Sequence, residues 1–162
     1  MEKLISKILQ YIAYLFYGDT IPNPVMEEPI KEEPKVVEEV KPKEELLKRF
    51  CKCIAAYEGG PGNRNHRNNN PGNIKAPRKA AISKDKDGFC IYPSWEVGMN
   101  DLIFMVRNAC LGESKIHKPT ETITQFFKVY APSADHNDPD AYAKWVCNSL
   151  GIPTSTQIRE LL

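Results

Sequence analysis

The part of the chain best suited to chemistry is a single acid followed by a glycine break and an asparagine-rich loop. One face of a predicted helix carries residues spaced i, i+4, i+7 and i+11, namely Leu47, Cys51, Ile54 and Glu58. The face is apolar except for Glu58, and the sequence Gly-Gly-Pro-Gly at 59–62 ends the helix directly after it. The negative end of the helix dipole and a partly apolar setting both disfavour an ionised carboxylate. Glu58 is therefore a candidate general acid, because such a group must hold a proton near neutral pH.

The loop after Glu58 is unusually rich in amides. Its asparagines are Asn63, Asn65, Asn68, Asn69, Asn70 and Asn73. Amides donate and accept hydrogen bonds, so they can pair with sugar hydroxyls and acetamido groups. Asparagine also suits turns and left-handed backbone, and Pro71-Gly72 is a turn signal, so an ordinary surface loop is the alternative. Because the loop directly follows the acid, we favour a binding site.

Two stretches around this acid read Ala-Tyr-Glu-Gly-Gly at 56–60 and Arg-Asn-Asn-Asn-Pro-Gly-Asn-Ile at 67–74. They resemble the catalytic region of lysozyme-like peptidoglycan hydrolases of phages and prophages. The resemblance covers about residues 46–162 and continues through Phe-Cys-Ile-Tyr at 89–92, Trp-Glu-Val-Gly at 95–98, and Val-Tyr-Ala-Pro at 129–132 with the Asn-Asp-Pro of 137–139. It differs from the best-known lytic transglycosylases, which usually have a serine after the catalytic glutamate and then a Gly-Leu-Met-Gln-like motif. Here Gly59 follows the acid and no such motif is present, which leaves the reaction product open.

The resemblance implies a set of site residues. Glu58 would protonate the glycosidic oxygen, and Tyr130 would line the cleft and position the reacting sugar. Asn70 and Asn73 would hold the loop and contact N-acetyl sugars, while Asn137 and Tyr142 would also contact the substrate. Read from spacing alone, each tyrosine is equally a core aromatic on its helix.

The remaining pattern predicts a mostly α (α+β) domain, which by resemblance is lysozyme-like, with one small β-hairpin. Helices are expected over about 45–58, from a Ser94 cap to near Gly112, from a Thr120 cap through Tyr130, and from an Asp138 cap to Gly151. A capping box of Thr154 and Gln157 predicts a last short helix. Residues 79–83 and 88–92 are expected to pair across the turn at 84–88, whose Asp-Gly is a hairpin signal.

The N-terminal part has a different character, so we divide the chain into residues 1–20, 21–44 and 45–162. Residues 1–17 are apolar after two lysines, which suits a signal-like or membrane-anchoring helix or a helix docked on protein, although no small-residue cleavage site follows. Residues 21–44 are rich in proline, glutamate and lysine, which is typical of a solvated linker. This organisation predicts an extracytoplasmic, membrane-associated or virion location.

Charge is divided unevenly along the chain. Residues 20–45 hold eight acidic and four basic residues, whereas residues 46–162 hold eleven acidic and sixteen basic ones. A mildly basic domain suits an anionic polymer such as a bacterial wall. No cluster of basic residues with interleaved aromatics is present, so we do not expect nucleic-acid binding.

Other candidate chemistries are weaker. The five cysteines are an odd number and are mainly expected to be core thiols, while the three histidines lack metal-ligand spacing, so we expect no metal and no cofactor. Asp85 and Asp87 are candidates for the second carboxylate of a glycosidase, but they fit a turn better. If neither acts, cleavage must be substrate-assisted or use internal attack.

The sequence therefore predicts a monomeric glycosidase that cuts peptidoglycan glycan strands, as a muramidase or lytic transglycosylase. One alternative is a lysozyme-like module that binds glycan without cutting it, in a virion or envelope. The other is a chitinase-like or glucosaminidase enzyme.

Overall fold

The structure is a computed structural model that describes residues 40–162, with side chains from Glu44 onward except that of Asp135. In chain order its elements are α2 (Val40–Tyr57), α3 (Arg64–Arg67), β1 (Ser83–Lys84), β2 (Cys90–Ile91), α4 (Trp95–Leu111), α5 (Ile123–Tyr130), the 3₁₀ helix η2 (Ser133–Asp135), α6 (Pro139–Leu150) and the 3₁₀ helix η3 (Ile158–Leu161). This confirms a mostly helical α+β fold with one small antiparallel hairpin. The predicted N-terminal helix and almost all of the predicted linker lie outside the described residues.

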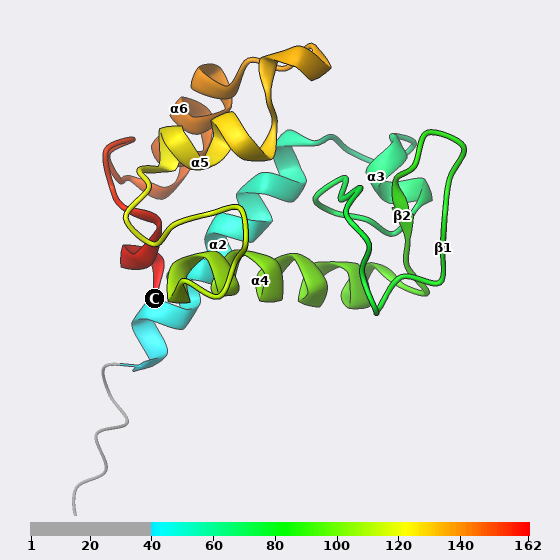
Figure 1. Cartoon of the computed structure of the whole chain (residues 1–162), viewed down its shortest axis with the longest axis horizontal. Coiled ribbons are helices and arrows are strands. Elements are labelled where there is room, and N and C mark those ends of the chain that lie inside the picture. Colours follow the sequence, from blue (N-terminus) through cyan, green and yellow to red (C-terminus); the bar gives the residue numbers. More distant parts are fainter. Residues whose placement is uncertain (1–39) are drawn as a thin grey trace, which may run out of the picture. The chain divides into compact units, whose positions relative to one another are not determined.

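Helix α2 is the centre of the domain. It packs against α4 on one side and α6 on another, and α5 packs on α6 (Figure 1). Leu47, Cys51 and Ile54 are fully buried, which confirms the apolar face predicted from their spacing. Burying a large aliphatic side chain contributes about 1.5–3 kcal/mol, so this stripe supplies much of the packing energy that fixes the end of α2.

Two of the predicted helices are confirmed at both ends by their caps. The Ser94 side chain accepts a hydrogen bond from the Val97 amide at the start of α4, and Gly112 ends that helix in a left-handed conformation. Asp138 accepts from the Ala141 amide at the start of α6, and Gly151 ends it in the same way. These caps fix the residues at which both helices begin and end.

Two other predicted caps are wrong. Helix α5 is capped by Thr122, not Thr120, because Thr122 forms a reciprocal capping box with Gln125 three residues later. The equivalent partner of Thr120 would be Ile123, which has no side-chain acceptor. Likewise η3 begins after Gln157, whose backbone amide donates to the Glu160 carboxylate. Thr154 does not cap it, and its carbonyl accepts from the Thr124 amide of α5 instead.

The hairpin is present, but its strands are shorter than predicted. Ser83 pairs with Ile91 and Lys84 with Cys90. The other edge of β2 binds the asparagine loop instead, because the amides of Cys90 and Tyr92 donate to the carbonyls of Ile74 and Asn68. The predicted turn at 84–88 is confirmed, with the Asp85 carboxylate accepting from the amides of Asp87 and Phe89. The hairpin and the loop therefore form one unit, at one end of α2 and α4 (Figure 1).

The cysteines of the described domain are free thiols. Cys51, Cys90, Cys110 and Cys147 are buried and Cys53 is half-buried, which confirms the prediction of core residues. Burial raises the pKa of Cys110 to about 12 and that of Cys147 to about 11, so these thiols stay protonated and inert. No helix within residues 40–162 is both long and apolar enough to cross a membrane.

Candidate active site

Most asparagines of the loop bind the protein itself. Asn65 donates to the carbonyls of Ala55 and Gly59, and Asn68 donates to the Asp85 carboxylate. Asn69 donates to the Tyr92 carbonyl at 3.2 Å and has a left-handed backbone with φ 50°. These amides replace the regular backbone hydrogen bonds that the irregular loop lacks. They hold the loop, including the unpredicted short helix α3, against α2 and the hairpin.

Asn70 is the loop asparagine whose side chain is most completely hydrogen-bonded to the protein. It is fully buried, and its amide donates to the carbonyls of Ile74 and Cys90 while its Oδ1 accepts from the Ile74 amide. The NH₂ group and the oxygen of this side chain are therefore all engaged with backbone. Asn70 therefore holds the loop, one half of its predicted role, and no part of it lines the cleft described below.

Asn73 is the loop asparagine that reaches the candidate acid. Its Nδ2 lies 2.7 Å from Oε2 of Glu58 and donates to it. The backbone of Asn73 is left-handed, with φ 46°, which turns the side chain toward the end of α2. The Oδ1 atom of Asn73 is enclosed and has no partner within the described residues.

Tyr142 binds the other oxygen of the acid. Its hydroxyl donates to Oε1 of Glu58 at 2.9 Å and lies 3.3 Å from the Ile54 carbonyl. The ring is held between Phe127 and Tyr57, with centroid distances of 4.2 and 3.8 Å. Burial raises the pKa of Tyr142 far above its usual value, and the nearby Glu58 carboxylate adds to this, so the hydroxyl remains a donor. Tyr142 is a support for Glu58 and does not line the cleft.

Tyr130 lies beside this group on the last turn of α5. Its hydroxyl donates to the Gly72 carbonyl at 2.6 Å, which ties α5 to the asparagine loop. A Cβ atom on Gly72 would stand 2.6 Å from that hydroxyl oxygen, so only glycine permits the contact. Burial raises the pKa of Tyr130 well above its usual value, and the Glu58 carboxylate adds to it. The tyrosine is therefore a neutral group at the site.

Glu58 and Tyr130 open onto one cleft of about 680 Å³. One wall comes from the loop and hairpin, through residues 72–76 and Phe89, and another from residues 129–131 at the end of α5. The predicted substrate residue Asn137 lines the same cleft and donates to the Pro132 carbonyl at 3.4 Å. The structure thus brings Glu58, Asn73, Tyr130 and Asn137 to one cavity, with Tyr142 and Asn70 behind its walls.

Among the described residues that line the cleft, Asp87 is the only carboxylate besides Glu58. It is exposed and paired with Arg64 at 3.1 Å. Arg64 in turn lies over the Phe89 ring, with its guanidinium carbon 4.1 Å from the ring centroid. Asp85 is engaged in the hairpin turn and does not line the cleft. The arrangement offers one well-held acid and a charged pair at the edge formed by the hairpin.

The sequence did not point to several residues that line the cleft. The main ones are Met105 of α4, Ile116 and His117 of the following loop, and Val129 of α5. A signal was available only for His117, because Glu121 follows it at four residues and the two side chains form a pair at 3.0 Å. The apolar cleft residues Met105, Ile116 and Val129 stand in no sequence pattern that distinguishes them from other apolar residues.

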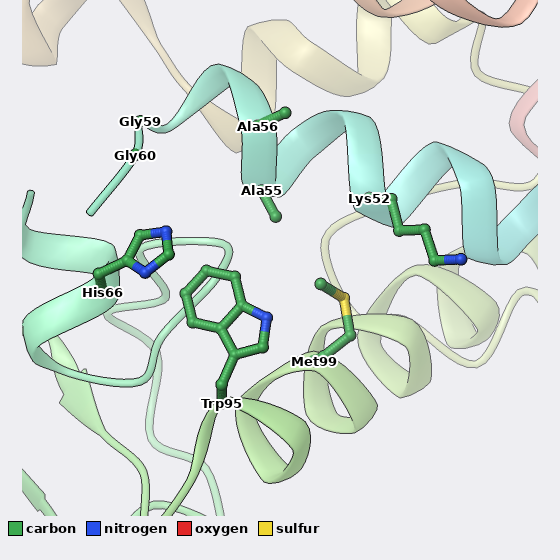
Figure 2. Close-up of a pocket in the computed structure, with 8 residues that line it drawn as sticks. All are labelled: Lys52, Ala55, Ala56, Gly59, Gly60, His66, Trp95 and Met99. Atoms are coloured by element: carbon green, nitrogen blue, oxygen red, sulfur yellow. The ribbon is translucent and has the colours of Figure 1, made fainter.

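A second, more open pocket of about 440 Å³ lies against the last turns of α2 (Figure 2). The rings of His66 and Trp95 stack in it, with centroids 4.3 Å apart, beside Met99 and Lys52. It is lined by no carboxylate, so it offers no general acid. Within the part of the chain that the structure describes, no group of three or more His, Cys, Asp or Glu could hold a metal ion.

Comparisons of the chain with protein-family models, with curated proteins and with solved structures found no match.

Proposed function

We propose that this protein is a glycosidase that cleaves the glycan strands of bacterial peptidoglycan, with Glu58 as the general acid. The observation that carries the proposal is the placement of Glu58, which opens onto a cleft and is held through both oxygens by Asn73 and Tyr142. The resemblance of residues 46–162 to lysozyme-like phage hydrolases supplies the substrate class, and their excess of five positive charges suits an anionic wall.

In the proposed reaction Glu58 transfers a proton to the glycosidic oxygen while an oxocarbenium-like state develops on the neighbouring sugar. The bond between that sugar and the oxygen breaks, and the leaving sugar departs as an alcohol. The cation is then captured by water or by a hydroxyl oxygen of the same sugar, and the proton that the attacking oxygen loses goes to the Glu58 carboxylate or, for water, to Asp87. Capture by water gives a reducing end, and internal capture gives an anhydro end. Asp87 is the cleft carboxylate available to assist a water, and internal attack requires no second acid.

The two supports of Glu58 suit a group that changes protonation state. Tyr142 remains a donor, so it fixes the position of Oε1 throughout the reaction. The amide of Asn73 can present its NH₂ group to a carboxylate or its Oδ1 to a carboxylic acid, because an amide carries both a donor and an acceptor. The enclosed, unpartnered Oδ1 is available for the second arrangement.

The test is to incubate the full chain with purified sacculi and identify the released fragments by mass. Anhydro-sugar ends would indicate a transglycosylase and reducing ends a hydrolase, and the identity of the terminal sugar would separate a muramidase from a glucosaminidase. Chitin oligomers as a parallel substrate test the chitinase-like alternative. Binding to sacculi without any released fragment would contradict the proposal and favour a glycan-binding module.

Glu58→Gln is the decisive variant. The amide keeps the shape of the side chain but removes the transferable proton, and general acid catalysis contributes about 10²–10⁴-fold. We expect cleavage to fall by at least about 100-fold, while glycan binding and the unfolding temperature change little. Glu96→Gln, at an exposed position in the first turn of α4, is the matched control and should cleave at the parent rate. Cleavage by Glu58→Gln at more than a tenth of the parent rate would rule out Glu58 as the acid.

A further inference from the structure

We propose that His117, oriented by Glu121, is a substrate-binding residue of the cleft and accepts a hydrogen bond from the acetamido N–H of an N-acetylhexosamine. This inference rests on the proposed function, because it assigns a contact within the same cleft. His117 is neither the proposed acid nor one of the two residues that hold it.

His117 is held too rigidly to be an incidental surface residue. Its side chain is only 3% exposed, and its Nδ1 lies 3.0 Å from Oε2 of Glu121. Its ring stacks on the buried Phe126 at a centroid distance of 4.4 Å, and its backbone amide donates to the Ser114 hydroxyl at 3.1 Å. Two contacts therefore fix the imidazole in the wall of the cleft, and a third fixes its backbone.

The other ring nitrogen, Nε2, has no partner in the protein. Nε2 makes no hydrogen bond within the described residues, although His117 lines the cleft. The fully enclosed, unpartnered side-chain atoms in that part of the chain belong to Asn73 and Gln157, so Nε2 of His117 is not fully enclosed. A polar atom on an otherwise buried side chain lacks a protein partner here, and a ligand group can supply one.

For a neutral imidazole, the pairing with Glu121 decides which kind of ligand group fits. A carboxylate accepts hydrogen bonds only, so Nδ1 carries the proton in the pair. In the neutral imidazole this leaves a lone pair on Nε2, which requires a donor on the ligand. An N–H or O–H of a sugar meets this requirement, whereas a carbonyl does not.

The apolar neighbours favour an acetamido group over a hydroxyl. Ile116, which is 68% exposed, lines the same cleft as His117, as does Met105 of α4. An acetamido group pairs an N–H donor with a methyl group, so it can satisfy Nε2 and cover apolar surface together. The stack from His117 through Phe126 to Tyr130, whose rings lie 5.5 Å apart in the second step, fixes this position relative to the catalytic end of the cleft.

The first measurement needs no change at His117. Full-length, isotope-labelled Glu58→Gln protein is titrated with short peptide-free glycan strands from peptidoglycan, and the imidazole nitrogens are followed by NMR. We expect the Nε2 resonance of His117 to move upfield as it accepts a hydrogen bond, and an intermolecular NOE between an acetyl methyl and Ile116. Glycan binding without a change at Nε2 would overturn the inference, and a change at Nε2 without the methyl NOE would overturn the acetamido assignment.

Two variants then test the contact by affinity. His117→Asn places its amide NH₂ where Nδ1 lies, so it can keep the bond to Glu121, but it has no atom at the position of Nε2. His117→Gln places an amide oxygen or nitrogen near that position. We expect His117→Asn to bind the strands about tenfold more weakly, which corresponds to about 1.4 kcal/mol, and His117→Gln to recover part of the loss.

The outcomes separate this inference from the function on which it rests. Binding by His117→Asn within twofold of the parent would contradict the role of His117 and leave the glycosidase proposal standing. If the parent protein neither binds nor cleaves any glycan strand, the proposed function fails and this inference fails with it. Circular dichroism and the unfolding temperature of each variant confirm that a loss of binding does not come from unfolding.

Discussion

The hydroxyl of Tyr142 donates a 2.9 Å hydrogen bond to Glu58 across 84 residues of sequence. This contact joins the start of α6 to the end of α2, and the Ile54 carbonyl lies 3.3 Å from the same hydroxyl. The Tyr142 ring is 2% exposed and stacked on both faces. The packing of α6 on α2 therefore sets the orientation of the candidate acid, and a change in that packing should change the orientation of the Glu58 carboxylate.

Tyr142→Phe tests this relationship. Phenylalanine keeps the two ring stacks but loses the hydroxyl, so Oε1 of Glu58 is no longer fixed. A hydrogen bond to a charged group is worth about 1.5–3 kcal/mol, part of which is recovered by water at the cleft. We expect kcat on glycan strands to fall about tenfold with KM nearly unchanged, and we expect a loss of stability of about 1 kcal/mol.

Tyr57→Phe is the matched control, because Tyr57 stacks on Tyr142 but is 39% exposed and its hydroxyl has no hydrogen bond within the described residues. It should retain the parent kcat. Equal losses in both variants would show that ring packing, and not the hydroxyl of Tyr142, is what Glu58 depends on.

Asn73→Gly tests the second support of the acid. Glycine accepts the left-handed backbone of residue 73 without strain, so the variant removes the amide and leaves the loop conformation in place. We expect cleavage to fall at least about tenfold, because Oε2 of Glu58 loses its donor, and the free energy of unfolding to fall by up to about 1.5–3 kcal/mol, the value of a hydrogen bond to a charged group.

Asn69→Gly provides the comparison, since Asn69 has the same left-handed backbone but donates to the Tyr92 carbonyl instead of Glu58. It should lose stability and keep activity per folded molecule. Steady-state kinetics and urea unfolding on both proteins decide the matter, and parallel changes in the two variants would show that Asn73 has no special relation to the acid.

The sequence predicts the helix boundaries of the domain better than it predicts the roles of the site residues. The starts of α4 and α6 follow from the sequence because the caps Ser94 and Asp138 act within four residues. The start of α5 is equally local, since Thr122 and Gln125 form a capping box that Thr120 cannot form with Ile123. Where a boundary depends on neighbours in the chain, the sequence contains the answer.

The roles within the asparagine loop depend on contacts that are distant in sequence. Asn70 and Asn73 have the same chemistry and lie three residues apart, yet one is enclosed by the Cys90 carbonyl and the other faces Glu58. That difference arises only when β2 and the end of α2 are brought to the loop. The place of His117 in the cleft wall also depends on a tertiary contact, the packing of its ring on Phe126.

Gly98→Ala should destabilise the domain by packing alone. A Cβ atom on Gly98 would lie 2.0 Å from the Asn69 carbonyl oxygen and 2.8 Å from Cδ of Pro71. The nearest atom belongs to the backbone and cannot rotate away, so α4 and the loop must separate. Overpacking of this kind costs about 1–3 kcal/mol, which exceeds the gain of up to about 1 kcal/mol from helix propensity.

Gly60→Ala is the control, because a Cβ there meets nothing within 4 Å. Replacing that glycine should leave the free energy of unfolding unchanged or raise it slightly, since alanine restricts the unfolded chain. Urea unfolding of both variants is the measurement. A Gly98→Ala protein as stable as the parent would show that the approach of α4 to the asparagine loop is looser than the structure indicates.

The last prediction concerns pH and the ion pair that anchors the segment before the hairpin. Arg78 donates to both oxygens of Asp101, at 2.7 and 2.6 Å, and the Tyr92 hydroxyl donates to the same carboxylate at 2.6 Å. Burial acts to raise the pKa of Asp101, but the hydrogen bonds from Arg78 and Tyr92 outweigh it and lower the pKa below its usual value. The folded state therefore binds this proton less readily than the unfolded state.

A lowered folded pKa fixes the sign of the effect. The stabilisation is fully present above the unfolded pKa, which is about 3.9 for aspartate, and it is lost as pH falls through the folded pKa. Asp101→Asn should cost roughly 2–4 kcal/mol at pH 7, because Arg78 and Tyr92 lose a largely buried partner, and the difference from the parent should narrow below about pH 4. Asp87→Asn is the control, since its exposed pair with Arg64 contributes at most about 1 kcal/mol at any pH. Urea unfolding of the three proteins from pH 7 to pH 3 provides the comparison. A gap between the parent and Asp101→Asn that stays constant down to pH 3 would show that Asp101 does not titrate in this range.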